Sequence, residues 1–185
     1  MANAVKEAEK LLERLGMKDK IPVDVMEIAR ALGAKVVLKA FDGEDDLSGM
    51  LFQDNNQIII GVNANHHPNR RRFTVAHEIG HLVLHKHIFE GRVHVDKAFE
   101  VKMFRDGRSK QGKDFIEIQA NRFAAELLMP TESLKRELKD KYVDVENDDE
   151  VKALANKYEV SAHAMSIKLF NTASDLFETQ ESLPL

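Results

Sequence analysis

The sequence predicts an α+β fold that is mainly helical and carries a small, mostly antiparallel sheet of three strands. Hydrophobic residues recur at helical spacing near both ends and in the middle of the chain, whereas short β-branched runs between turn residues fall within 35–62. The 185 residues are 43% hydrophobic and 31% charged, as in globular proteins. One compact domain with a smaller helical subdomain fits this length.

Charge and cysteine content exclude several classes of function. With 27 Lys and Arg against 31 Asp and Glu, the net charge of −4 gives no global field for binding nucleic acid or anionic lipid. The absence of cysteine excludes disulfides, thiolate metal sites and cysteine nucleophiles, so any metal must be held by His, Asp or Glu. No apolar run is long enough to span a bilayer, and we expect a cytoplasmic protein with no membrane partner.

The N-terminal part predicts two helices and then the sheet. Apolar residues at helical spacing run from Val5 to Leu15, and a second helix begins at the N-cap Asp24. Gly16 and Gly33 stand where a left-handed residue would end each helix. The predicted strands cover residues 35–38, 49–52 and 57–62.

Two apolar helices are predicted in the second half of the chain. The first extends from Asn69 to about Lys86, and the second begins at the N-cap Asp114 and ends before Pro130. We expect the sheet to pack on the first of them. Residues 87–113 are turn-rich and predict no defined element.

The C-terminal part predicts a subdomain over residues 142–185 that packs on a domain formed by residues 1–141. A short polar helix over 131–141 precedes an acidic linker, and two closing helices then resemble a helix-turn-helix pair, with a frayed tail from residue 175. Its few lysines are offset by glutamates, so we expect packing on the core, not direct binding to nucleic acid.

The segment from His77 to His81 carries the clearest chemical signal. Two histidines four residues apart lie on one face of a helix, where both imidazoles can bind a single zinc ion. Glu78 follows the first histidine and is placed to reach a water on that ion and to act as general base. Zinc makes such a water more acidic and polarises a carbonyl group. Apolar flanks predict a dry cleft.

A zinc site that keeps one open position needs a third protein ligand. Glu117 is favoured because it stands among apolar residues of the second helix, with Asn121 one turn later to hydrogen-bond a ligand histidine. His85 is the rival, but its position one further turn along the first helix places its ring too far for all three to converge. We therefore expect His85 to support the site from outside the ligand set. Arg72, at the start of the first helix, is expected either to neutralise acidic neighbours or to contact a substrate backbone.

Two segments resemble the signatures of the ImmA/IrrE family of metallopeptidases. These are residues 71–85, with the sequence RRFTVAHEIGHLVLH, and residues 117–130, with the sequence EIQANRFAAELLMP. Residues 22–33, 47–50 and 154–165 resemble other parts of the same family. Many members have an acidic residue where this chain has Gln119.

The resemblance implies a compact, mainly helical α+β fold with a small sheet and a metallopeptidase site that holds one zinc ion per chain. We assign this metallopeptidase domain to residues 1–141. Carried over by position, His77, His81 and Glu117 would be the zinc ligands and Glu78 the catalytic base. Known relatives cleave helix-turn-helix repressors, and they occur in mobile elements and stress responses. The expected partner is such a repressor encoded nearby.

Two hypotheses for the function follow. The first is a zinc-dependent endopeptidase that cuts a protein substrate, in keeping with the resemblance. The alternative is a non-catalytic or toxin-like module that docks to a helix-turn-helix partner or to DNA through residues 151–170. Glu78 favours the enzyme, because a purely structural zinc site has no use for a base and closes with four protein ligands.

Overall fold

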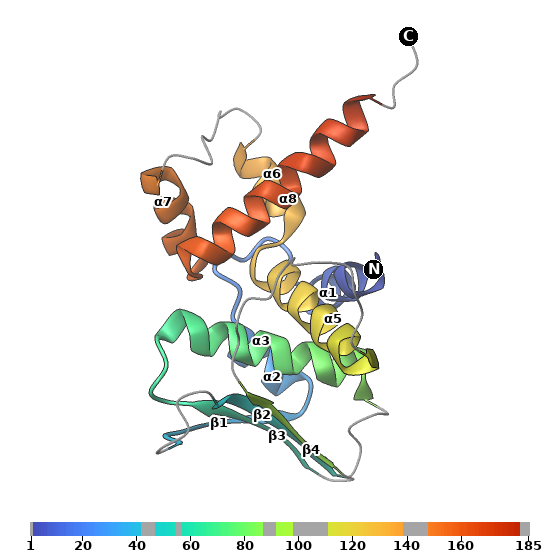
Figure 1. Ribbon diagram of the computed structural model, residues 1–185, viewed down its shortest axis with the longest axis vertical. Coiled ribbons are helices and arrows are strands. Elements are labelled where there is room, and N and C mark those ends of the chain that lie inside the picture. The colour runs from blue at the N-terminus through green and yellow to red at the C-terminus, as the bar shows by residue number, and fades with distance from the viewer. Residues whose placement is uncertain are drawn as a thin grey trace.

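The computed structural model describes residues 2–41, 47–54, 57–86, 92–97, 111–138 and 148–181. Figure 1 shows the sheet at one end of the molecule and α3 across it, with α2 on the sheet side of α3 and the other helices beyond α3. The elements are α1 (Ala2–Arg14), α2 (Val25–Ala31), β1 (Ala34–Lys39), β2 (Leu47–Asp54), β3 (Gln57–Asn63), α3 (Pro68–Leu84), β4 (Arg92–Lys97), α5 (Gln111–Leu128), α6 (Thr131–Leu138), α7 (Asp148–Tyr158) and α8 (Ala162–Glu181).

The α+β fold class predicted from the sequence is confirmed, and the sheet is larger than predicted. Its strands lie in the order β1-β3-β2-β4. β2 pairs antiparallel with β3 and with β4, whereas β1 and β3 run parallel, with Ala34 opposite Ile58. The three predicted strands are present, and the fourth lies in the segment for which the sequence predicted no element. Arg92–Lys97 contains only two valines among polar residues, which gives a weak strand signal.

The N-terminal helices end and begin where the sequence predicts. Gly16 and Gly33 follow α1 and α2 with φ of 65° and 75°, the left-handed region that glycine enters without strain. The Asp24 carboxylate accepts hydrogen bonds from the backbone N–H groups of Met26 and Glu27 at 2.9 and 3.0 Å, so it caps α2.

The hydrophobic core lies where α3 packs against the sheet, α1 and α5. Leu51 and Ile60 come from the sheet, Ile79 from α3 and Phe123 from α5, and all four are fully buried. Two large apolar residues of α5 are not buried: Phe115 is 53% exposed and Ile118 is 44% exposed. The helix also begins at Gln111, three residues before the predicted N-cap Asp114.

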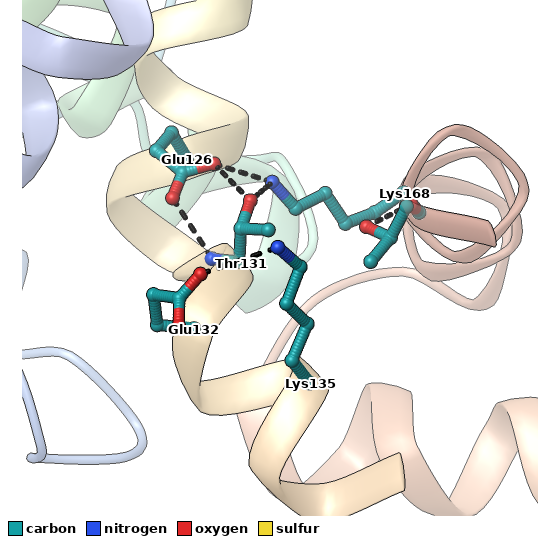
Figure 2. Close-up of polar contacts among 6 residues, drawn as sticks. Glu126, Thr131, Glu132, Lys135 and Lys168 are labelled. Atoms are coloured by element: carbon teal, nitrogen blue, oxygen red, sulfur yellow. Dashed lines mark hydrogen bonds and ion pairs between the residues drawn. The ribbon is translucent and has the colours of Figure 1, made fainter. Parts of the chain in front are cut away.

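The two C-terminal helices are docked on the rest of the molecule. Figure 2 shows Lys168 of α8 reaching Glu126 at the end of α5 and Thr131 at the start of α6. Lys168 Nζ donates to Glu126 at 2.5 Å and to the Thr131 hydroxyl at 2.8 Å, and Glu126 is 1% exposed. The helix-turn-helix-like pair therefore packs on the core through a buried ion pair.

The ends of this C-terminal region differ from the prediction. The last residues of the predicted acidic linker form the first turn of α7, which begins at Asp148. α8 continues to Glu181 where the sequence predicted a frayed tail from residue 175, and Figure 1 shows it projecting from the body. Phe170 of this helix is 69% exposed. Residues 182–185 lie outside the described part of the chain.

Candidate metal centre

The two motif histidines lie side by side in the buried middle of α3. Pro68 occupies the first turn of this helix, and the Nδ1 atom of His67 caps it by accepting a hydrogen bond from Asn69 N–H at 3.2 Å. Three turns later His77 and His81 are 1% and 0% exposed, with ring centroids 4.5 Å apart. The four-residue spacing thus brings both imidazoles to one point inside the protein.

Glu117 of α5 faces these histidines. Its Oε2 atom lies 3.2 Å from His77 Nε2 and 3.4 Å from His81 Nε2, and the two Nε2 atoms are 2.8 Å apart. Ligands about 2.0–2.1 Å from a tetrahedral zinc ion lie roughly 3.3 Å from each other. The three atoms therefore form a triangle of the size that three zinc ligands require.

The hydrogen bond of His77 fits a metal ligand. Its Nδ1 atom lies 3.0 Å from Asn121 Oδ1, and an amide oxygen can only accept, so Nδ1 carries the ring proton. The Nε2 atom of neutral His77 then presents a lone pair to Glu117 and His81. A carboxylate oxygen and lone-pair nitrogens converging on one point are a donor set for a cation, and the residues present fit zinc.

His85 and Gln119 extend the centre on its other side. His85 is 4% exposed, and its Nδ1 atom lies 3.3 Å from His81 Nδ1. Its Nε2 atom lies 2.9 Å from Gln119 Oε1. His85 therefore contacts a candidate ligand from the side away from the triangle, as expected from its position along the helix.

Glu78 is fully buried between α3 and β2. Its Oε1 atom would lie 2.9 Å from a Cβ atom placed on Gly49, and the same Cβ would collide with Thr74. Gly49 lets the strand backbone approach the Glu78 carboxylate. A larger residue at this position would push β2 away from α3 or displace the Glu78 carboxylate.

The pKa of His81 is shifted in the direction that metal binding requires. Burial is the main cause that lowers the pKa of His81 to about 4; the neighbouring His77 and His85 act in the same direction, and Glu117 opposes them. His81 is therefore neutral at pH 7, and a neutral imidazole is the form that binds a metal.

The family model described as IrrE N-terminal-like domain, a peptidase family, matches residues 29–170. The chain belongs to the ImmA/IrrE family. The match includes both motif helices and continues through α7 into α8. A metallopeptidase-type family thus accounts for the centre built by His77, His81 and Glu117.

The solved structure of a Mycobacterium tuberculosis transcriptional regulator resembles this ImmA/IrrE chain, with a TM-score of 0.56 at 17% identity. The similarity covers 89% of this chain and 45% of that one, so the chain spans less than half the length of the regulator. At this identity the likeness shows the fold alone. No curated protein sequence matches the chain.

Arg72 pairs with an acidic neighbour, which is one of the two roles that the sequence left open for it. Its guanidinium donates to the carbonyl oxygens of Val23 and Glu159 at 2.9 and 3.3 Å, and it pairs with the Glu159 carboxylate at 3.2 Å. Glu159 has a φ of 52° in the turn between α7 and α8. Arg72 therefore holds that turn against α3, with Asn69, whose side chain donates to Val160 O at 2.8 Å.

Two features of the centre were missed in the sequence. Gln119 was noted only as a departure from the family's usual acidic residue, yet it contacts His85. Gly49 was counted as part of a strand, although a glycine inside a strand often marks a close approach of another group. In the described residues, no helix is long and apolar enough to cross a membrane.

Proposed function

We propose that this chain is a zinc-dependent endopeptidase that hydrolyses one peptide bond in a helix-turn-helix repressor, acting in the cytoplasm. The observation that carries the proposal is the triangle formed by the Nε2 atoms of His77 and His81 and the Oε2 atom of Glu117, with Glu78 next in sequence to His77. One zinc ion per chain would be held by these three residues. When bound, it supplies Lewis-acid activation of a water molecule and of the scissile carbonyl.

Glu78 supplies the proton transfer in this proposal. A buried carboxylate that is next in sequence to a ligand histidine can accept a proton from the attacking water and pass it to the leaving amine. Gly49 lets the backbone of β2 lie close to this carboxylate. A centre made only for structure would not need a base in this position.

The choice of a repressor as substrate rests on the family resemblance, and it brings a physical constraint. A peptide bond inside a packed helix can reach the centre only after local unfolding, which costs free energy that a mobile loop does not require. We therefore expect a single cut in an exposed loop or helix end outside the DNA-binding core of the repressor.

The test is to incubate the zinc-loaded protein with the helix-turn-helix repressor encoded nearest to it and to identify the fragments by mass spectrometry. The Glu78→Gln variant serves as the matched control. One cut that appears only with the wild-type protein would support the proposal. A repressor that binds but stays intact under every metal condition would instead favour a non-catalytic docking module.

The packing of the C-terminal helices favours the enzyme over that module. Asn69 and Arg72 hold the turn between α7 and α8, and Lys168 fixes α8 to α5 through Glu126. A recognition unit that inserts into a DNA groove has to present its second helix freely. Here the first turns of that helix are held against the peptidase core.

A further inference from the structure

We infer that Gln119 and His85 act together as positioning residues that set the tautomer of His81, fixing its ring proton on Nδ1 and directing its Nε2 lone pair at the metal. The inference rests on the proposed function, since it takes the triangle of His77, His81 and Glu117 to be a zinc centre. It assigns a role to two side chains that touch neither the metal nor the substrate.

A continuous series of side-chain contacts leads from Gln119 of α5 to the candidate metal centre. Gln119 Oε1 lies 2.9 Å from His85 Nε2, and His85 Nδ1 lies 3.3 Å from His81 Nδ1. The Nε2 atom of His81 then faces His77 Nε2 at 2.8 Å and Glu117 Oε2 at 3.4 Å. His81 and His85 are both buried, so each of these ring contacts lies away from bulk water.

The positions of the protons follow from what each atom can do. An amide oxygen only accepts, so His85 Nε2 must carry the proton that it donates to Gln119. A neutral imidazole has one N–H, which leaves a lone pair on His85 Nδ1. His81 Nδ1 must then donate to it, and His81 Nε2 is left without a proton.

The ring proton of His77 is also fixed on Nδ1, but by a direct contact with an amide oxygen. Asn121 Oδ1 accepts directly from His77 Nδ1 at 3.0 Å, whereas Gln119 acts on His81 only through the ring of His85. Both amides belong to α5, the helix that also supplies Glu117. One helix therefore provides the third ligand and orients the other two.

The orientation of the Gln119 amide decides the outcome. If its NH₂ group faced His85 instead, His85 Nε2 would accept, His85 Nδ1 would donate, and His81 would carry its proton on Nε2. That proton would occupy the position that a metal needs. The two orientations therefore predict opposite tautomers for both histidines, and these can be measured.

The first experiment reads the tautomers directly in the full chain labelled with nitrogen-15 histidine. Two-bond proton–nitrogen correlation spectra are recorded without metal and with zinc, and His85→Asn identifies the His85 signals. We expect His85 to carry its proton on Nε2 in both samples, and His81 to carry its proton on Nδ1. A His85 proton on Nδ1 would overturn the inference, with or without zinc bound.

The second experiment measures zinc affinity by competition with a chromophoric chelator. Gln119→Leu should weaken binding by about 10- to 100-fold, the usual effect of losing a group that orients a ligand. Gln57→Leu is the matched control, because Gln57 is an exposed glutamine of β3 and the same chemical change there should leave affinity unchanged.

A rescue variant separates orientation of His81 from simple packing. In His85→Asn the side-chain oxygen can accept from His81 Nδ1 without help from Gln119, so this variant should bind zinc more tightly than His85→Leu. Gln119→Leu added to His85→Asn should then have no further effect. If His85→Asn and His85→Leu lose affinity equally while circular dichroism shows both folded, Gln119 and His85 only fill space.

These results are independent of peptidase activity. Correct tautomers and the expected affinities in a protein that cleaves nothing would support the inference and count against the proposed function. Cleavage by a protein with the opposite tautomers would support the function and overturn the inference.

Discussion

Gly80 of α3 lies directly against the backbone of Ala120 of α5. A Cβ atom on Gly80 would be 3.2 Å from both the Cα and the carbonyl oxygen of Ala120, and equally close to the Phe123 ring. Ordinary carbon contacts lie at about 3.5–4.0 Å, so the absence of a side chain sets the spacing of the two helices. Because α3 carries His77 and His81 and α5 carries Glu117, this spacing also sets the size of the ligand triangle.

We predict that Gly80→Ala weakens zinc binding. Alanine in a helix interior gains roughly 1 kcal/mol over glycine, but an extra methyl group in a packed core costs about 1–3 kcal/mol. The atoms that it meets are mainly backbone, so α5 has to move and take Glu117 with it. Zinc competition and urea unfolding measure the two effects.

Gly61→Ala is the control for this change. A Cβ atom there would meet the Met50 side chain at 2.5 Å, which can rotate away. The control should bind zinc normally, and a similar loss in both variants would show that the spacing of α3 and α5 is not the cause.

The ligand assignment predicts which residues hold the metal. His77→Ala, His81→Ala and Glu117→Ala should each lose most of the one zinc ion expected per chain, measured by elemental analysis after dialysis. His163→Ala, an exposed histidine of α8, should keep it. Normal zinc content in Glu117→Ala would reject the carboxylate as third ligand.

Glu78→Gln separates the base from the ligands. The variant keeps the shape of the side chain, so metal content and fold should be unchanged while cleavage falls by about 10²- to 10⁴-fold. Glu132→Gln changes an exposed carboxylate of α6 in the same way and should cleave normally. A Glu78→Gln variant with full turnover would require another proton acceptor.

The sequence predicted the motif side of the centre well because helix periodicity determines it. The spacing of His77 and His81 places both on one face, and the spacing of Glu117 and Asn121 does the same on α5. On that basis Asn121 is predicted to hydrogen-bond one of the ligand histidines, and in the structure its Oδ1 atom lies 3.0 Å from His77 Nδ1.

Contacts between distant segments could not be read from periodicity. Three contacts join residues far apart in sequence: β1 pairs with β3, Arg72 forms an ion pair with Glu159, and Gln119 lies against His85. Helical spacing assigns residues to faces, but it does not say which partner meets each face. The sequence therefore left two roles open for Arg72, an acidic neighbour or a substrate, and it could not name Glu159 as the partner.

The low pKa of His81 predicts acid sensitivity in the metal-free protein. In the unfolded chain a histidine binds its proton near pH 6.5, whereas buried His81 does so only near pH 4. Between these values the unfolded state holds the extra proton, so the free energy of unfolding falls as pH falls, by up to about 3 kcal/mol at pH 4. Urea unfolding at pH 7, 5.5 and 4.5 measures the loss.

The control for this effect is His81→Phe, which has no titrating group at the position. Its unfolding free energy should depend on pH less steeply than that of the wild type, by about one proton between pH 6.5 and 4. Equal slopes in the two proteins would assign the acid sensitivity to other groups.

We predict that the ion pair between Lys168 and Glu126 contributes strongly to the stability of the contact between α8 and the peptidase core. Lys168→Met removes the cation from a buried pair and leaves Glu126 with only the Thr131 N–H and hydroxyl, which donate to it at 2.8 and 2.7 Å. Breaking one side of such a pair costs about 3–5 kcal/mol, because an uncompensated charge stays buried. Urea unfolding at pH 7 should show this loss.

Figure 2 places the matched control one turn away, where Lys135 pairs with Glu132 on the surface of α6. Both partners of that pair are more than one third exposed, so water screens their charges and Lys135→Met should cost less than about 1 kcal/mol. Glu126→Gln combined with Lys168→Met removes both charges and should recover part of the loss, since no unpaired charge is left buried. If Lys168→Met and Lys135→Met unfold at the same urea concentration, the Lys168 pair does not fix α8, and the docking of the C-terminal helices must depend on Asn69, Arg72 and apolar packing.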